Sequence, residues 1–126
     1  MKIAVVGAHL SGMPLNGQLT ERGGTLVRAA KTKDVYRLVA LPGTVPPKPG
    51  MFRVAEATGV GIAVEVWELS TEAFGSFVGI VPSPLCIGTV ELEDGESVKG
   101  FLCEQYATAG ARDITQLGGW RAFVNA

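Results

Sequence analysis

Short strand-like runs set the limits on what this chain can fold into, because only one segment has a clear helical periodicity. About six or seven such runs are rich in β-branched and other apolar residues, and they do not alternate with helices as βαβ units do. Residues 87–92 and 97–103 flank an Asp94-Gly95 turn, which is a strong signal for a hairpin. The pattern predicts an α+β fold with a mostly antiparallel, barrel-like sheet.

Further local signals divide the rest of the chain. Strands are also predicted over four other segments: residues 2–8, 25–32, 35–41 and 62–69. A short helical stretch is predicted near residues 15–22, and Gly23-Gly24 is expected to stop it. Residues 42–50 hold four of the seven prolines and are predicted to form an ordered loop between two strands.

The one clear helix is predicted to begin after Ser70, which is a good N-cap. Leu69, before the cap, and Phe74, in the first turns, fit a hydrophobic staple. Pro82 and Pro84 are expected to end the helix. Apolar side chains recur at the helical spacing and indicate one side that faces a core: Phe74, Phe77, Val78 and Val81.

Length and composition exclude several classes of protein. The 126 residues predict a single domain, residues 1–126, and a net charge of −1 with scattered charges argues against a nucleic-acid partner. One histidine and two cysteines cannot supply the usual zinc sites, so no metal and no other cofactor is expected. No apolar run approaches the ~20 residues of a membrane span and no secretory signal is recognisable. We therefore expect a cytoplasmic protein with no membrane association.

The cysteines and glycines do not form a known catalytic motif. Cys86 and Cys103 are predicted to be buried thiols, since no CxxC pair is present; a disulfide between them is the alternative. The only histidine is far away in sequence, which argues against a nucleophilic cysteine. Met13-Pro14 stands where a phosphate loop needs Lys and then Ser or Thr, and Val64 stands where a dinucleotide fingerprint needs its third glycine.

His9 and the residues after it form the first candidate site. A strand that runs into His9-Leu10-Ser11-Gly12 and then into a short helix predicts backbone N–H groups that turn outward together, which suits an anion. His9 titrates near neutral pH and can donate a proton to a carboxylate. The alternative is a strand-end histidine that is hydrogen-bonded to the backbone.

Arg112 and Asp113 form a second candidate. Arg112 is suited to binding a carboxylate with two donors. The alternative is an ordinary turn, in which Asp113 and Thr115 cap backbone groups. Lys99, on the predicted hairpin, and Arg121 are either solvated charges or part of a small pocket for an anion.

Glu65 is the one carboxylate that we expect to point inward, because it alternates with Trp67 on a predicted strand. An inward carboxylate in a cleft is a candidate for acid–base chemistry. An ion pair with a neighbouring cation is the alternative.

Six segments, in order along nearly the whole chain, resemble the C-terminal domain of allophanate hydrolase. They are VGAHLSGMPLN at 6–16, EVWEL at 65–69, IGTVEL at 87–92, VKGFLCE at 98–104, DIT at 113–115 and GGWR at 118–121. That domain is similar to the gamma-glutamylcyclotransferase-like superfamily, whose fold is a small mixed β-barrel with flanking helices. In that superfamily the loop after the first strand cradles the substrate, which implies a binding role for Leu10, Ser11, Gly12 and Asn16.

The resemblance also implies a function. In full-length allophanate hydrolase an amidase domain releases ammonia from allophanate, and the C-terminal domain acts on the product, N-carboxycarbamate, assisting its decarboxylation and supporting assembly. By this likeness the chain is expected to bind a small dicarboxylate or carbamate-type anion in urea and allophanate nitrogen metabolism. His9 is implied as the catalytic acid. The implied binding residues outside the loop are Glu65, Lys99, Arg112 and Asp113.

Two departures from these families limit the expectation. The chain has no room for an amidase domain, so we expect a stand-alone domain that does not hydrolyse allophanate by itself. The acid of the cyclotransferases would fall near residues 80–81, which are Ile and Val, so cyclotransferase activity is not expected. The alternative function is a non-catalytic partner or assembly module for a separately encoded amidase-family protein; a homodimer fits the same sequence.

Overall fold

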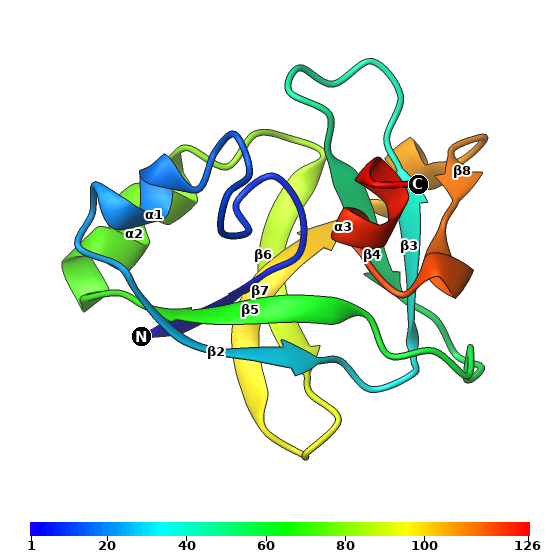
Figure 1. The fold of residues 1–126 in the computed structure, drawn as a ribbon, viewed down its shortest axis with the longest axis horizontal. Coiled ribbons are helices and arrows are strands. Elements are labelled where there is room, and N and C mark those ends of the chain that lie inside the picture. Colours follow the sequence, from blue (N-terminus) through cyan, green and yellow to red (C-terminus); the bar gives the residue numbers. More distant parts are fainter.

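The N-terminal strand lies inside a five-stranded sheet (Figure 1). The computed structural model describes residues 1–126. The strand order is β2-β5-β1-β7-β6, where the elements are β1 (Lys2–Val5), β2 (Thr25–Lys31), β5 (Ala63–Glu68), β6 (Leu85–Glu91) and β7 (Ser97–Cys103). β1 is parallel to β7, and the other neighbouring pairs are antiparallel. Strands covered on both faces read as continuous apolar runs, as residues 2–8 do.

A second, three-stranded sheet lies at the end of the molecule opposite to helices α1 and α2 (Figure 1). Its order is β4-β3-β8, with β3 (Tyr36–Ala40), β4 (Pro49–Arg53) and β8 (Arg112–Asp113). The loop predicted over residues 42–50 is therefore shorter than expected, because a strand already begins at Pro49. Proline is tolerated there because β4 is an edge strand and Pro49 is its first residue.

Three short helices complete the fold: α1 (Gly17–Thr20), α2 (Thr71–Gly79) and α3 (Trp120–Val124), with 3-10 turns at Gln105–Thr108 and Thr115–Leu117. The predicted start of α2 is confirmed, since the Ser70 hydroxyl accepts a hydrogen bond from the Ala73 N–H at 3.1 Å, but the helix ends at Gly79 and does not include Val81. Phe77, on its core-facing side, is fully buried. None of these helices has the length and apolar character needed to cross a membrane.

The expected barrel is present only in part, because the edges of the five-stranded sheet touch at one end alone. At one end of the five-stranded sheet the edge strands meet, through a bridge between Thr32 and Leu92 and a hydrogen bond from the Lys33 N–H to the Glu91 carbonyl at 3.0 Å. β3, β4 and β8 pair only with one another and make a separate sheet. The α+β class with mostly antiparallel strands is confirmed. Only this isolated bridge joins the two edges, and three strands form a second sheet, so the closed barrel of the prediction becomes one curled sheet beside a smaller one.

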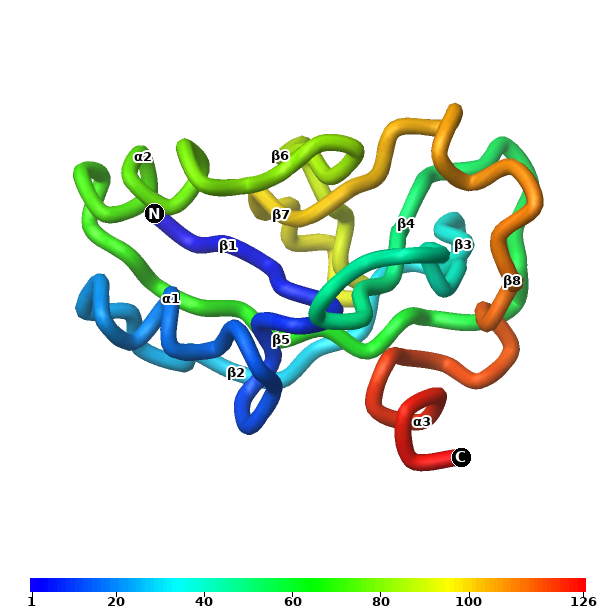
Figure 2. Tube along the Cα trace, turned by 90° about the horizontal axis from the view of Figure 1, so that it is seen from above, coloured from blue at the N-terminus to red at the C-terminus, as the bar shows by residue number.

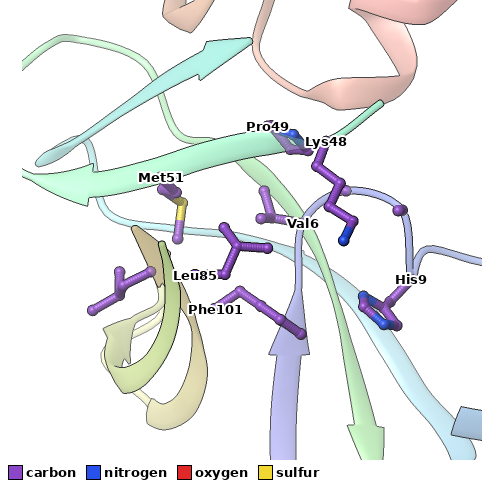
Figure 3. A pocket seen from close by; sticks show the side chains of 10 residues that line it. Val6, His9, Lys48, Pro49, Met51, Leu85 and Phe101 are labelled. Carbon is purple, nitrogen blue, oxygen red and sulfur yellow. The ribbon is translucent and has the colours of Figure 1, made fainter. Parts of the chain in front are cut away.

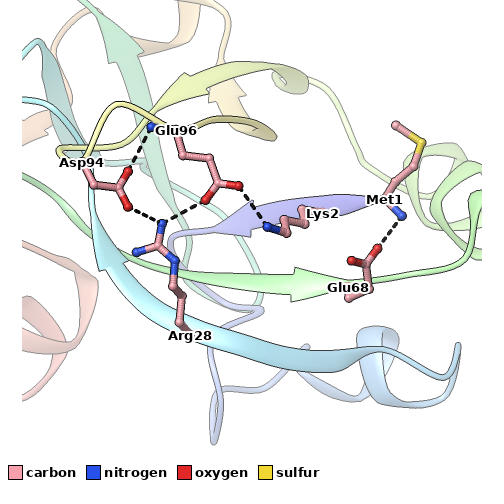
Figure 4. Close-up of polar contacts among 6 residues, drawn as sticks. All are labelled: Met1, Lys2, Arg28, Glu68, Asp94 and Glu96. Atoms are coloured by element: carbon pink, nitrogen blue, oxygen red, sulfur yellow. Dashed lines mark hydrogen bonds and ion pairs between the residues drawn. The ribbon is translucent and has the colours of Figure 1, made fainter.

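Ion pairs connect β2 to the β6–β7 hairpin (Figure 4). Arg28 on β2 contacts Asp94 at 2.7 Å and Glu96 at 2.9 Å. Glu96 also contacts Lys2 at 2.9 Å. Exposed ion pairs of this kind add little to stability, so we interpret the network as setting the direction of the hairpin.

The segment that leads into β4 reaches the end of β1 (Figure 2), and this approach requires a glycine. A Cβ added to Gly7 would come closer than 3.0 Å to Cγ and Cδ of Pro49. Gly50 is also crowded, since its Cβ would lie 2.9 Å from the Sγ of Cys103. These two contacts fix the backbone on either side of Pro49, and with it the position of Lys48.

We expect Gly7→Ala to destabilise the chain by about 1–3 kcal/mol, the usual cost of overpacking a crowded site. The matched control is Gly17→Ala, because a Cβ at Gly17 meets nothing within 4 Å and the residue lies in α1. Alanine there should leave stability unchanged or raise it by up to ~1 kcal/mol. Urea denaturation of both variants measures the difference. Equal stabilities would mean that the approach of Pro49 does not depend on Gly7.

Candidate functional site

Four consecutive backbone amides after β1, those of Val6 to His9, have no acceptor within the protein. Gly7, Ala8 and His9 are buried, yet none of their N–H groups donates to a protein atom. Nearly all buried N–H groups in folded proteins have an acceptor. The next two amides do: Leu10 N–H donates to the Gly7 carbonyl at 3.0 Å, and Ser11 N–H donates to a buried carboxylate at 2.8 Å. Adjacent amides without an acceptor are suited to an anion.

The imidazole ring of His9 is held on several sides. Its Nε2 lies 2.7 Å from Oε1 of Gln18, and because an amide oxygen only accepts, Nε2 carries a hydrogen. The ring stacks on Phe101 and meets the Phe77 ring edge-on, with centroids 5.0 Å away in each case. Asn16 donates from Nδ2 to the His9 carbonyl at 2.8 Å and so fixes the backbone.

The charge of His9 is set by its surroundings. Burial lowers the pKa of the imidazole, the hydrogen bond to Gln18 raises it, and the nearby Lys48 ammonium group lowers it further. The net pKa lies below the ordinary value of 6.5, so His9 is neutral at pH 7 when no ligand is bound. A negative charge in the site would act in the opposite direction and draw a proton onto His9.

Two pockets meet at His9 and Lys48, the two residues that line both of them. The inner pocket has a volume of about 20 Å³ and is also lined by the segment with the free amides. Figure 3 shows the Lys48 side chain extending toward His9, with the apolar side chains of the inner pocket nearby. The outer pocket is wider, about 230 Å³. The inner pocket is lined by Val6, Gly7, Ala8, His9, Lys48, Pro49, Met51, Leu85, Phe101 and Leu102. The outer pocket is lined by His9, Leu15, Gln18, Val45, Pro46, Lys48, Ile80, Val81 and Pro82.

Lys48 is the functional candidate that the sequence analysis missed. Its backbone N–H donates to the Thr44 hydroxyl at 2.9 Å, which orders the turn before β4. Its side chain takes part in none of the ion pairs of the molecule, so its ammonium group is available to a ligand. The sequence shows a single lysine in a proline-rich loop, and no local sequence feature indicates that this loop lies beside His9.

Glu65 is buried as predicted and follows the ion-pair alternative. It accepts hydrogen bonds from the Ser11 N–H at 2.8 Å and the Ser11 hydroxyl at 3.0 Å, from Trp67 Nε1 at 3.2 Å and from Arg121 at 3.0 Å. Burial raises the pKa of this carboxyl, but the hydrogen bonds outweigh burial, and the net pKa lies below its ordinary value. Glu65 is therefore ionised, and its two hydrogen bonds from Ser11 hold the loop that follows His9.

The loop residues named from the sequence line neither pocket at His9, and their tasks differ from those expected. The N–H groups of Leu10 and Ser11 already have acceptors, so the free amides lie earlier, at residues 7–9. Gly12 is exposed and has a φ of 79°, which favours glycine at that turn. Asn16 holds the carbonyl of His9.

The structure does not bring the remaining predicted residues to the pocket. Lys99 donates to the Thr89 hydroxyl at 3.1 Å on the exposed hairpin. Arg112 lies over the Phe123 ring, 5.3 Å from its centroid. None of these side chains lines either pocket at His9.

Asp113 follows the turn-capping alternative. It accepts a hydrogen bond from the Thr115 N–H at 2.9 Å and contacts Arg37 at 3.1 Å. Burial raises the pKa of this carboxyl, but these partners outweigh burial and leave the pKa below its ordinary value.

The cysteines take no part in the site. Cys103 is buried, Cys86 is half-buried, and both are free thiols, so the prediction of unpaired cysteines is confirmed. Burial raises the pKa of each thiol, which disfavours the nucleophilic thiolate. No three side chains of the His, Cys, Asp and Glu types are grouped in a way that could hold a metal ion.

The fold and the site define a small α+β domain whose inner strand ends in a histidine-lined pocket. Within that class, the chain belongs to the allophanate hydrolase C-terminal domain family, whose model matches residues 1–125. It is 48% identical over 128 residues to urea amidolyase of Lachancea kluyveri, covering 99% of this chain and 7% of that protein. The chain thus spans only a small part of the curated relatives that it matches.

Solved structures agree with this assignment. Allophanate hydrolase of Kluyveromyces lactis superimposes with a TM-score of 0.94 at 46% identity, over 98% of this chain and 21% of that chain. A protein specific to uropathogenic E. coli superimposes with a TM-score of 0.89 at 37% identity, over 98% of this chain and 94% of that chain. A gamma-glutamyl cyclotransferase, at 13% identity and a TM-score of 0.57, shares the fold alone. The resemblance found in the sequence is confirmed.

The lowered pKa of His9 predicts a pH dependence of stability just below neutrality. The unfolded chain takes up this proton first as the pH falls, because the pKa in the folded chain is below 6.5. The free energy of unfolding should therefore fall as the pH drops below about 6.5, by at most ~1.4 kcal/mol per pH unit from this group.

Denaturant titrations at about pH 7.5 and about pH 5.5 measure this loss. The control is His9→Gln, whose side chain does not titrate, and this variant should lack that part of the pH dependence. An identical pH dependence in the two proteins would mean that folding does not change the pKa of His9.

Proposed function

We propose that the His9 pocket binds a small dicarboxylate or carbamate-type dianion and assists the decarboxylation of N-carboxycarbamate in urea and allophanate nitrogen metabolism. The observation that carries this proposal is the row of free amides at residues 7–9, beside the unpaired Lys48 and the ring of His9. Fixed amide dipoles and an ammonium group are donors for a carboxylate, and they need no rearrangement before binding.

The shape of the two pockets supports a ligand with two acidic groups. The inner pocket has room for about one water-sized group, such as a single carboxylate oxygen, whereas the outer pocket is roughly tenfold larger. A short dianion would place one carboxylate on the amides and Lys48, and the rest of the ligand in the outer pocket. His9 lines both pockets, so its ring would lie beside the atom that joins the two carboxylates.

The proposed chemistry uses the coupling between ligand charge and His9. The neutral imidazole takes up one proton from solvent when the dianion binds, because a neighbouring negative charge raises its pKa. In N-carboxycarbamate the bond between nitrogen and one carboxylate carbon breaks, and CO₂ leaves. The bonding electron pair stays on nitrogen, which accepts the proton from His9. The products are carbamate, CO₂ and a neutral imidazole.

The relatives supply the metabolic context of this proposal. Urea amidolyase and allophanate hydrolase carry the matching segment as 7% and 21% of their chains, so most of each protein lies outside it. We assign ammonia release to a part of such proteins that lies outside this segment.

A second candidate function is that of an assembly module for such an amidase-family protein. It is favoured by the same observation, that the relatives join this segment to a much longer chain. A module of this kind needs a docking surface and not a ligand, and it would bind its partner with His9 and Lys48 replaced. Self-association into a homodimer is the third arrangement that such a role allows.

Malonate distinguishes these functions, because it has two carboxylates on one methylene group and does not lose CO₂ readily. At 100 times its dissociation constant, malonate should stabilise the wild-type chain by about 2.7 kcal/mol, measured as a thermal shift. Lys48→Ala and His9→Ala should lose most of the shift. Lys99→Ala is the matched control, since that lysine is exposed on the hairpin and should leave the shift unchanged.

Absence of a shift in the wild type would contradict the anion-binding proposal. Co-purification with an amidase, unaffected by His9→Ala, would then support the assembly role. A shift that Lys99→Ala removes and Lys48→Ala retains would place the anion on the hairpin and away from the pocket.

A further inference from the structure

The outer pocket has an uneven lining. Its polar groups are His9, Lys48 and Gln18, and Gln18 already accepts the hydrogen bond from His9. The other lining residues are apolar: Leu15, Val45, Pro46, Ile80, Val81 and Pro82. The segment with the free amides, residues 7–9, lines the inner pocket. Of these residues only His9 also lines the outer pocket. Donors for a carboxylate are thus concentrated at one end of the site.

Three of these apolar residues are exposed, and for the two aliphatic ones, Val45 and Ile80, the packing of the core does not explain the exposure. Val45 is 94% exposed and Ile80 is 44% exposed, and neither packs against the hydrophobic core, whereas Val81 does. Val45 lies before β4 and Ile80 follows α2, so two distant segments each supply an apolar side chain to the same pocket. An apolar wall beside a lysine and a histidine suits a ligand group that is charged when it binds and becomes neutral during the reaction.

We propose that Val45, Ile80 and Val81 form the subsite for the carboxylate that leaves as CO₂, an inference that rests on the function proposed above. A carboxylate beside an apolar wall loses part of its hydration, which costs free energy. CO₂ is neutral and has no such cost. The wall therefore raises the free energy of the bound dianion relative to the transition state, in which negative charge leaves this carboxylate.

The inference also fixes which bond breaks. The carboxylate on the amides and Lys48 stays with nitrogen and becomes the carbamate group. The carboxylate in the outer pocket gives up its bond to nitrogen, leaves the electron pair there and departs as CO₂ toward solvent. The nitrogen takes its proton from the protonated His9, so charge and atoms balance.

The test is Ile80→Lys, which places an ammonium group at the apolar wall. It should bind malonate about two- to fivefold more tightly, the range for a partly exposed ion pair. It should also slow turnover, because a carboxylate that is held by a cation is stabilised in the bound state and loses that stabilisation as CO₂ forms. A defect in folding would weaken binding and turnover together, so opposite changes identify the subsite.

Malonate affinity is measured by calorimetry. Turnover is measured as CO₂ release from N-carboxycarbamate, generated from allophanate by a separate amidase, after subtraction of the uncatalysed rate. Leu117→Lys controls for the added charge, since Leu117 is equally exposed at 44% and lines neither pocket at His9. Val45→Lys repeats the test from the other segment.

Tighter malonate binding with slower turnover in Ile80→Lys and Val45→Lys supports the subsite. Faster turnover, or no change in either value, overturns it and leaves the proposed function standing, since the wild type would still bind malonate and release CO₂. A wild type that neither binds malonate nor accelerates CO₂ release overturns the proposed function and the subsite together.

Discussion

The buried carboxylate of Glu65 is the interaction on which the site depends. A charge in the interior is costly unless donors surround it, and Glu65 meets this requirement with donors from Ser11, Trp67 and Arg121. These donors belong to the loop after β1, to β5 and to α3, so one carboxylate joins three parts of the chain. The Ser11 N–H donates to Glu65, and this hydrogen bond holds the turn that precedes Ser11. In that turn the amides of residues 7–9 have no acceptor within the protein.

Local sequence predicted the elements well and their pairing poorly. The Ser70 cap and the Asp94-Gly95 hairpin are confirmed because each depends on a few adjacent residues. The barrel prediction did not include the second sheet, in which β3 pairs with β4 and with β8, the latter far along the chain. No local signal specifies the pairing of Val39 with Asp113, which follows from how the sheets pack.

The same distinction separates His9 from Lys48. His9 was found because a titratable side chain at the end of an apolar strand is visible in a few residues of sequence. Lys48 was missed because its place depends on a contact between Pro49 and Gly7, across the end of β1. The sequence favoured Lys99 and Arg112 as cations, yet the fold directs these to the hairpin and to Phe123. Sites assembled by long-range contacts need the fold before their residues can be grouped.

Burial and Lys48 both lower the pKa of His9, which is unfavourable for an acid that must carry a proton at pH 7. In the proposed reaction this lowered pKa makes the site selective for ligands that carry two negative charges. Without a dianion the imidazole is neutral and has no proton to deliver. A ligand with one negative charge is largely balanced by Lys48 and leaves His9 near its resting state, whereas a second charge favours the imidazolium. A second carboxylate, which is the group that the proposed chemistry removes, would then favour the protonated form of His9.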